Sequence, residues 1–449
     1  MKKILGAGCA LVLALVLVVA GVGAYFVSRL DTPELKESLL QQAKATLGTE
    51  LKVKEMKISL LSGVTLKAIA VQNPAPFPGQ LLTADAFVLR YRLMPLLAGR
   101  MEVERLALEK PALAIAMDTK GAFNYEKLGR AAAKGAPAAP GATTATATPL
   151  RIVMKELAVD NGSIVMTDYA KARLMTVDAI DFKSAFEVTG GIALGAGQVT
   201  IGKGNFGDVL FVKNVRAPLS MSKEKLTLSP IKGDVAGGGI SGDLNVDLKG
   251  FRYTTQMTLK GASVKTLLEE ARTTPFVTGT LSATARFDGS GGLPTMRGEG
   301  SADISSCRAQ NSKVLGLLAS VLQLPELANP DFETCHVEFK QTGNRFATPV
   351  VKLTGDAVRL SGQGSVNLDS RALDYDMNLA LSPKVFAKLT RPELRGAFQP
   401  QADGFQGIAF KLTGTTLEPK TDLLSRIGKG AATGAAKGIL DRLFKKKGL

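Results

Sequence analysis

The feature that most constrains this chain is a regular alternation of apolar and polar residues, seen without a break in the segment RALDYDMNLALS at residues 371–382. Successive side chains of a β-strand point to opposite faces, so the segment predicts a strand with one apolar and one polar face. A helix or a second sheet normally covers such an apolar face. The apolar positions are Leu373, Tyr375, Met377 and Leu379.

The same alternation recurs along most of the 449 residues, and two further segments show it clearly. Their apolar positions are Leu244, Val246 and Leu248 in the first, and Leu281, Ala283 and Phe287 in the second. Spacing of this kind predicts a mostly β protein with on the order of 20 short strands. The dipeptide Asn161-Gly162 predicts a tight hairpin turn between two of them. Abundant Gly (47 residues) and few aromatic residues (6%) suit short turns between strands.

The N-terminus carries an uncharged run from Ile4 to Val27, longer than the ~20 residues that span a bilayer. Lys2 and Lys3 precede the run, which predicts a cytoplasmic N-terminus and an exported body. We therefore expect an uncleaved transmembrane anchor over residues 1–30. A cleavable signal peptide is the alternative, although its apolar region is usually shorter.

Three later segments interrupt the strand pattern. Residues 31–48 predict a helix that begins near Asp31 and ends at Gly48. Residues 130–150 are rich in Ala, Pro and Thr, which predicts a linker. Residues 312–330 predict a second helical segment, which lies between Cys307 and Cys335. In an oxidising compartment these cysteines are candidates for a disulfide, and two buried free thiols are the alternative.

The C-terminal residues 426–449 predict a basic, amphipathic tail. Apolar residues precede a run of lysines here, so the tail is suited to an anionic membrane surface, and a soluble terminal helix is the alternative. The residues of this pattern are Leu443, Phe444, Lys445, Lys446 and Lys447. The net charge of +16 does not indicate nucleic-acid binding, because no basic stretch is interleaved with aromatic residues.

Residues suited to catalysis are few. His336 is the single histidine and follows Cys335 at the start of a predicted strand, so an ordinary structural histidine is the better interpretation. A zinc site needs more Cys and His ligands than the two Cys and one His that follow the predicted anchor. The segment GGGISG at residues 237–242 precedes another alternating strand rather than a helix, which favours a turn over a dinucleotide site. We expect no enzymatic activity, no cofactor and no metal.

The order of several turn and strand motifs resembles the AsmA family of anchored periplasmic proteins in Gram-negative bacteria. The resemblance begins in the segment LLSGVTLKAIAVQN and continues through Pro95-Leu96-Leu97, Gly99, Pro111, Gly121 and Asn124. A later segment, KELAVDNGSIVMTD, ends on Asp168, and residues 307–419 resemble the C-terminal region of the family. These motifs consist of turn and strand residues rather than catalytic ones.

The resemblance implies a twisted, elongated antiparallel sheet that curls into an open groove with an apolar concave face. It also implies an inner-membrane protein with its bulk in the periplasm, which binds phospholipid or another envelope lipid for outer-membrane biogenesis. The alternating apolar residues named above are then candidates for the lipid groove. A closed β-sandwich is the alternative fold. A non-enzymatic assembly factor that binds outer-membrane or other envelope proteins is the alternative function.

The expected organisation has six parts. They are an anchor (1–30), an AsmA-like N-terminal β region (31–129), the linker (130–150), a middle β-groove region (151–275), an AsmA-like C-terminal β region (276–425) and the tail (426–449).

Overall fold

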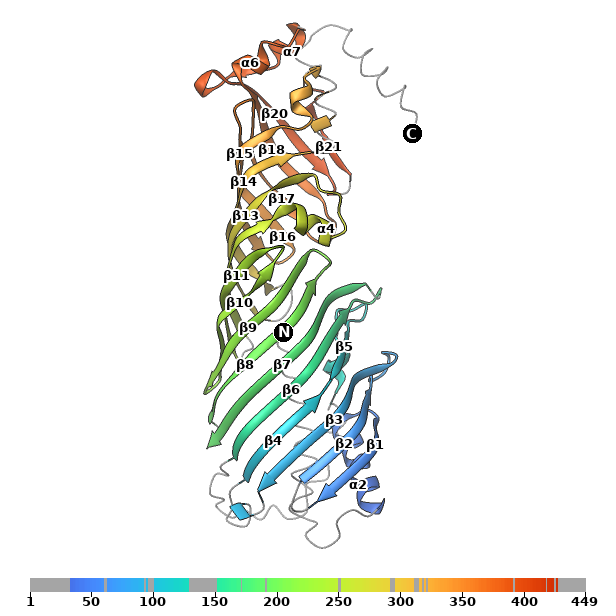
Figure 1. Cartoon of the computed structure of the whole chain (residues 1–449). Helices are drawn as coiled ribbons and strands as arrows, with labels where there is room; N and C mark the ends of the chain where they lie inside the picture. The colour runs from blue at the N-terminus through green and yellow to red at the C-terminus, as the bar shows by residue number, and fades with distance from the viewer. Residues whose placement is uncertain are drawn as a thin grey trace. The chain divides into compact units, whose positions relative to one another are not determined.

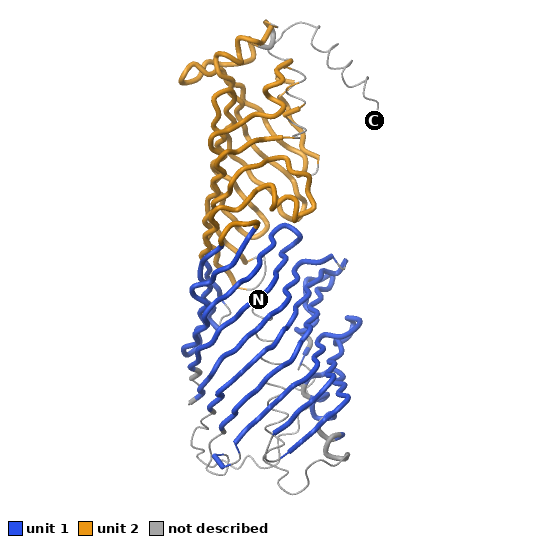
Figure 2. The backbone as a smooth tube through the Cα atoms, in the orientation of Figure 1, with its two compact units in different colours: residues 1–235, 240–255 blue, residues 236–239, 256–449 orange. Residues whose placement is uncertain are grey.

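The chain divides into two compact units in the computed structural model (Figure 2). Unit 1 comprises residues 1–235 and 240–255, and unit 2 comprises residues 236–239 and 256–449. The structure describes residues 33–59, 63–92, 94–95, 101–128, 152–170, 172–189, 192–248, 252–290, 295–310, 315–316, 319, 322–390, 392–416, 418–423 and 425–426. The predicted anchor, the linker and nearly all of the basic tail lie outside these ranges. Among the described residues no helix is both long and apolar enough to cross a membrane.

In the residues that the structure describes, unit 1 begins with a helix that is followed by consecutive strands (Figure 1). The helix α2 (Pro33–Leu47) confirms the helix expected over residues 31–48, and a short 3-10 turn, η1 (Asn124–Lys127), follows the fifth strand. The strands are β1 (Leu51–Ser59), β2 (Gly63–Gln72), β3 (Gln80–Arg92), β4 (Met101–Glu109), β5 (Ala112–Ala116), β6 (Ile152–Thr167), β7 (Arg173–Thr189), β8 (Ile192–Phe206), β9 (Leu210–Ser222) and β10 (Lys225–Val235). Two strands, β11 (Gly238–Asp247) and β12 (Arg252–Ser263), contain residues of both units.

Unit 2 is also mainly strand, with short helices between the strands (Figure 1). The strands are β13 (Val277–Ser290), β14 (Arg297–Ala309), β15 (Asp331–Thr342), β16 (Arg345–Thr354), β17 (Val358–Asn367), β18 (Leu373–Leu381), β19 (Gln399–Pro400), β20 (Gln406–Gly414) and β21 (Pro419–Thr421). The helices are α4 (Val264–Glu270), η4 (Pro325–Leu327), α6 (Pro383–Phe386), α7 (Pro392–Gly396) and η5 (Ala402–Gly404).

The fold is mostly β, with a 21-stranded sheet and few helices, as the alternation predicted. Neighbouring strands are mainly antiparallel, with one exception that the sequence did not predict. Both β4 and β5 pair with β6 in the parallel direction, so the expectation of an antiparallel sheet is wrong at this point. The connection from β5 to β6 includes residues outside the described ranges, and a parallel pair needs such a long crossover.

The hairpin predicted at Asn161-Gly162 is also wrong, because both residues lie inside the single strand β6. They lie where β4 ends and β5 begins on the neighbouring side: Lys110 donates its N–H to the Asp160 carbonyl at 2.8 Å, and Ser163 donates to the Pro111 carbonyl at 2.7 Å. Asn161 has a φ of 53°, and the register with β7 shifts on both sides of Gly162. The dipeptide therefore forms a bulge rather than a turn.

The hydrophobic core of unit 1 lies between α2 and the first strands. Ala43 and Leu47 of α2 pack with buried residues of β1 to β5, among them Ile69, Phe87 and Leu106. Side chains of β6 such as Leu157 are only partly buried against this core. The core therefore covers the first strands and ends at β6 in the described part of the unit.

The hydrophobic core of unit 2 lies where helical segments cover the last strands. Buried side chains come from residues 322–328 and 383–398, which we call the end cap, and from the strand ends beneath it. Lys388 forms an ion pair with Glu326, which joins the two segments of the end cap. Arg395 donates hydrogen bonds to the carbonyls of Leu389 at 2.6 Å and Ala387 at 2.8 Å, so it closes the end of α6.

Candidate functional site

The strand register of unit 2 aligns the apolar residues of different strands in straight rows across the sheet. Directly paired residues point to the same face, so each row describes one face of the sheet. One row consists of Leu281, Ile304, Cys335, Leu353, Leu360, Leu379 and Ile408, from β13 to β20. The next row consists of Ala283, Ala302, Val337, Val351, Gly362, Met377 and Phe410. A row nearer the other end of the strands consists of Phe287, Gly298, Gln341, Phe346, Val366 and Leu373.

These rows place the candidates from β13 and β18 on one common face, which we call the apolar face. Leu281 lies in the row of Leu379, Ala283 in the row of Met377, and Phe287 in the row of Leu373. On β13 the apolar side chains are half-buried, and the intervening residues, such as Ser282 and Arg286, are exposed. The alternation seen in the sequence therefore separates two chemically different faces.

The apolar face is covered by protein at one end and not at the other. Leu379 is 0% exposed and Met377 is 8% exposed, and both belong to the core beneath the end cap. Leu373 and Tyr375 on the same strand are half-buried. In the second half of β18, therefore, protein rather than a ligand covers the apolar side chains.

Unit 1 has an equivalent apolar face. One row crosses nine strands: Ile58, Val64, Leu89, Leu106, Leu157, Ser184, Gly197, Leu219 and Leu228. A second row contains Met56, Leu66, Phe87, Leu108, Val159, Phe182, Val199 and Ala217. The row residues that come from β1–β4 belong to the core of the unit or pack against it. Phe182 and Val199, in contrast, are half-buried and lie outside that core. These β6–β9 residues are not among the candidates predicted from the sequence, although Phe182 and Phe186 occupy alternate positions of β7.

Glycine on one strand lies beneath a large side chain of the next strand on this face. A Cβ atom at Gly298 would lie 2.1 Å from the Phe287 ring, and one at Gly300 would lie 2.6 Å from the Phe339 ring. Phe339 also stacks with Phe287 at 6.3 Å and with Phe346 at 5.1 Å between ring centroids. The rings of Phe287 and Phe339 lie over glycine backbone, and together with Phe346 they form a continuous aromatic surface on the apolar face.

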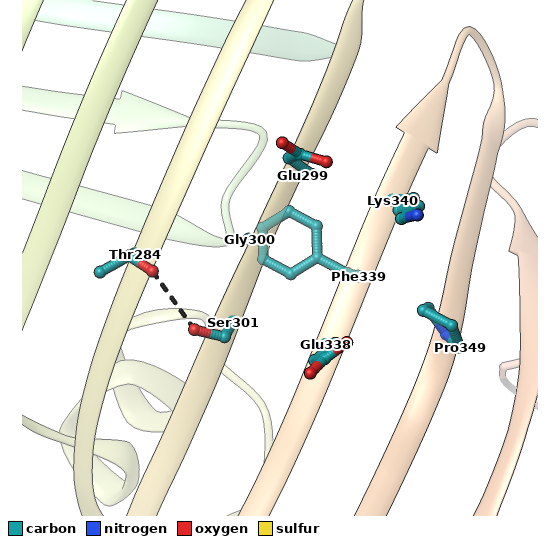
Figure 3. A pocket seen from close by; sticks show the side chains of 8 residues that line it. All are labelled: Thr284, Glu299, Gly300, Ser301, Glu338, Phe339, Lys340 and Pro349. Atoms are coloured by element: carbon teal, nitrogen blue, oxygen red, sulfur yellow. Dashed lines mark hydrogen bonds between the residues drawn. The ribbon is translucent and has the colours of Figure 1, made fainter.

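The opposite face of unit 2 is polar. A shallow pocket of about 260 Å³ opens there beside Gly300 (Figure 3). Its lining includes Glu338 and Lys340, which alternate with Phe339, and Thr284 and Ser301 contact each other through hydroxyl groups 3.2 Å apart. These polar side chains suit contact with water rather than with an apolar ligand.

The single histidine lies on this polar face. The Nδ1 atom of His336 is 2.6 Å from the Asp303 carboxylate, and its Nε2 atom is 3.7 Å from Glu338. The hydrogen bond with Asp303 raises the pKa of His336 above its usual value of 6.5. His336 therefore acts as one member of a surface charge network, in agreement with the structural interpretation of its sequence context.

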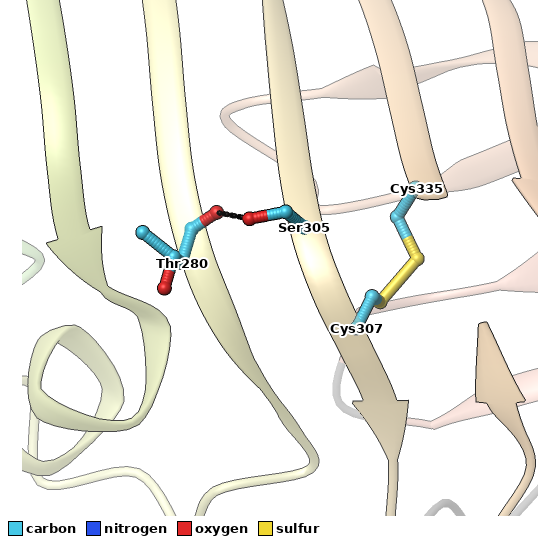
Figure 4. Close-up of a disulfide and its surroundings, with 4 residues drawn as sticks. All are labelled: Thr280, Ser305, Cys307 and Cys335. Atoms are coloured by element: carbon cyan, nitrogen blue, oxygen red, sulfur yellow. Dashed lines mark hydrogen bonds between the residues drawn. A yellow bond between two sulfur atoms is a disulfide. The ribbon is translucent and has the colours of Figure 1, made fainter. Parts of the chain in front are cut away.

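Cys307 and Cys335 form a disulfide between β14 and β15 (Figure 4). Their Cα atoms are 6.2 Å apart, and both residues are buried in the core of unit 2. Beside them the Ser305 hydroxyl lies 3.5 Å from the Thr280 carbonyl on β13. The disulfide closes the segment that contributes the first part of the end cap.

Among the remaining candidates, Val246 on β11 is 3% exposed, and Leu244 and Leu248 are half-buried. The Thr227 hydroxyl donates a hydrogen bond to Asn245 at 2.9 Å, so Asn245 shares a face with the polar positions of β10. Leu244 and Val246, which flank Asn245, consequently point to the opposite face. The tail residues from Leu443 to Lys447 lie outside the described residues.

Asn124, one of the residues that carry the family resemblance, has a structural function. Its side chain is 0% exposed and donates hydrogen bonds to Asn73 at 2.7 Å and to the Ala114 carbonyl at 2.8 Å. It thereby joins the turn after β5 to the end of β2. The adjacent Tyr125 is buried, which raises the pKa of its phenol.

Comparison with known proteins gave one match. Residues 1–185 match the model of the AsmA family, and these residues contain α2, β1–β6 and most of β7. A search of curated proteins and a search of solved structures each returned no match. Residues 1–185 of the chain are therefore similar to the AsmA family.

Proposed function

We propose that this protein binds lipid acyl chains on its apolar face and conducts lipid, in particular phospholipid, passively along that face. The observation that carries the proposal is the set of apolar rows, which cross nine strands in unit 1 and seven in unit 2 while remaining only half-buried on many strands. A soluble protein seldom leaves so much contiguous apolar surface without a partner.

Acyl chains fit this surface better than other common ligands do. Each buried CH₂ group contributes about 0.8 kcal/mol, so a long chain gains binding free energy gradually along a row. The rows contain few groups that could orient a polar ligand: Ser184 and Gln341 already donate to the carbonyls of Ala196 and Gly343. In our proposal the lipid headgroup stays in water beside the face, and no covalent step takes place.

The similarity of residues 1–185 to the AsmA family supports a role in the cell envelope. With it we propose an inner-membrane anchor at the N-terminus, a periplasmic body and a contribution to outer-membrane biogenesis. The uncharged run at residues 4–27 behind two lysines supports this orientation.

Site-specific photo-crosslinking in cells tests the lipid proposal. A photoreactive amino acid replaces Val199 in unit 1 or Ala285 in unit 2, both half-buried on the apolar face. The matched controls are the adjacent exposed residues Gln198 and Thr284. We expect phospholipid adducts at Val199 and Ala285 and none at the controls. Equal labelling of both faces would contradict lipid binding, and protein adducts on the apolar face would favour the assembly-factor function.

A further inference from the structure

Two neighbouring turns of unit 1 expose large apolar side chains. They are the turn from β6 to β7 and the turn from β8 to β9 (Figure 1). The exposed fractions are 37% for Val165, 64% for Tyr169, 36% for Leu174, 41% for Phe206, 69% for Val209 and 37% for Leu210. We call these six residues the tip surface. An exposed apolar cluster of this kind indicates a site of interaction.

The two turns form one surface because β7 and β8 are paired up to their ends. Met175 pairs with Phe206, and Phe206 pairs with Leu210. The N–H group of Gly207 in the second turn donates to the Leu174 carbonyl beside the first turn at 2.9 Å.

The tip surface is apolar on both faces of the sheet, unlike the strands behind it. Phe206 and Leu210 continue the row of Met166 and Met175 on the apolar face. Leu174 occupies the alternate position beside Met175, on the other face, where the middle of β7 carries exposed charged residues such as Lys183. If the tip surface were only an extension of the apolar face, it would be apolar on one side of the sheet alone.

Several backbone groups of the two turns are hydrogen-bonded within the turns. The Asp168 carboxylate accepts a hydrogen bond from the Ala172 N–H at 2.8 Å, and Asp168 donates its own N–H to the Ala172 carbonyl at 3.0 Å. The Asp208 N–H donates to the Asn205 side chain at 3.0 Å. A partner therefore meets mainly apolar side chains here, and pairing with an added β-strand is disfavoured.

We infer that the tip surface inserts into the acyl region of a lipid bilayer. The occupant is assigned as lipid because the tip surface is continuous with the apolar face, and so this inference rests on the proposed function. Projecting aromatic and aliphatic side chains suit a fluid, deformable apolar phase. Asp168 and Asp208 lie in the two turns and Arg173 lies next to the first turn, so charges of both signs are present and insertion does not depend on anionic lipid. Lipid can then pass between the bilayer and the apolar face without crossing water.

The absence of tryptophan from this sequence allows a direct test. A Val209→Trp variant of the full chain, reconstituted in phosphatidylcholine vesicles, carries a single fluorescent reporter at the tip surface. Brominated phosphatidylcholine, which quenches only Trp within the acyl region, is placed either in the host vesicles or in a second population of vesicles. Leu368→Trp is the matched control, because Leu368 is a 39% exposed residue in a hairpin turn of unit 2.

We expect quenching of the Val209→Trp reporter in at least one of the two arrangements and none at position 368. The host arrangement identifies docking on the membrane that holds the protein, and the second identifies docking on an opposing membrane. Absence of quenching in both arrangements, or equal quenching at both positions, would overturn the inference.

A second variant separates this inference from the proposed function. Tyr169→Asp introduces a charge at an exposed position, so the fold should persist, whereas quenching of Val209→Trp should fall at least fivefold. The photo-crosslink at Val199 reports lipid on the apolar face independently. If Val199 gives no lipid adduct while Val209→Trp is quenched, lipid conduction fails and membrane docking stands. If Val199 gives adducts and quenching is absent, docking fails and conduction stands.

Discussion

At the scale of single residues, burial separates positions that the sequence pattern makes equivalent. Phe287 and Leu379 both occupy apolar positions of alternating strands, and the register places them on one face. Phe287 is half-buried, whereas Leu379 is 0% exposed beneath the end cap. The first residue therefore borders the open part of the face, and the second belongs to a protein core.

A lysine should destabilise the protein far more at position 379 than at position 287. Leu379→Lys places an unpaired charge in the core and should lower the free energy of unfolding by about 3–5 kcal/mol. Phe287→Lys should cost less than about 1.5 kcal/mol, because its ammonium group can reach water from the open face. Thermal and urea unfolding of both variants tests this, and similar losses for the two would contradict an open face at Phe287.

The surface pair of His336 and Asp303 should give a measurable pH dependence. The pKa of His336 is raised by the hydrogen bond to Asp303, so its contribution to stability is full below about pH 6.5 and is lost as the pH rises through the raised pKa. The pair is partly exposed, so the effect should stay under about 1 kcal/mol. Urea unfolding of Asp303→Asn should differ from the parent at pH 5.5 and match it at pH 8.5. Asp374→Asn, an exposed control on the same face, should show no such difference, and a pH-independent effect of Asp303→Asn would contradict the pairing.

At the scale of elements, local patterns predicted most strands but not the pairing between them. Alternation at residues 281–287 and 373–379 was sufficient to define β13 and β18 and their apolar sides. The parallel pairing of β6 and the bulge at Asn161 depend on where β4 and β5 end, which is not encoded in β6 itself. A turn dipeptide inside a long strand is therefore a weak signal when a neighbouring strand is interrupted beside it.

The disulfide is the element whose removal is easiest to measure. Cys307 and Cys335 are 28 residues apart, and closing a loop of this length stabilises a fold by about 3–4 kcal/mol in the chain-entropy model. Cys307→Ser with Cys335→Ser should lower the free energy of unfolding by about this amount. Cys9→Ser, which leaves the pair intact, serves as the control, and alkylation of two free thiols in the native parent would contradict the bond.

At the scale of the whole molecule, the two units have separate hydrophobic cores. The core of unit 1 is built from α2 and β1–β6, and the core of unit 2 from β14–β20 and the end cap. This organisation could be predicted only in part. Composition and alternation indicated a large β protein, and the candidates on β13 and β18 were placed on one face. Coverage of Leu379 by residues 322–328 and 383–398 depends on long-range packing, which periodicity does not report.

Separate cores predict separate responses to mutation. In the Leu379→Lys variant, amide hydrogen exchange should rise throughout residues 307–423 and remain at parent levels in β1–β4 of unit 1. The reciprocal variant Leu106→Lys, at a residue 2% exposed in the core of unit 1, should show the opposite pattern. Mass spectrometry of exchanged peptides measures both, and a uniform rise across the chain in either variant would contradict independent cores.

The order of strand pairing has a consequence for how the chain folds during synthesis. From β6 onward, most of the strand pairs described above join a strand to the next one along the chain, with β18 and β20 as the main exception. Each new strand can therefore add to a template that has already been made, with only a short loop to close. The parallel pairing of β6 with β4 and β5 is different, because β6 is separated from both strands by a long connection and can pair only after that connection has been made. Growth of the sheet is in this sense vectorial, from the first-made strands toward the last, and the end cap completes it.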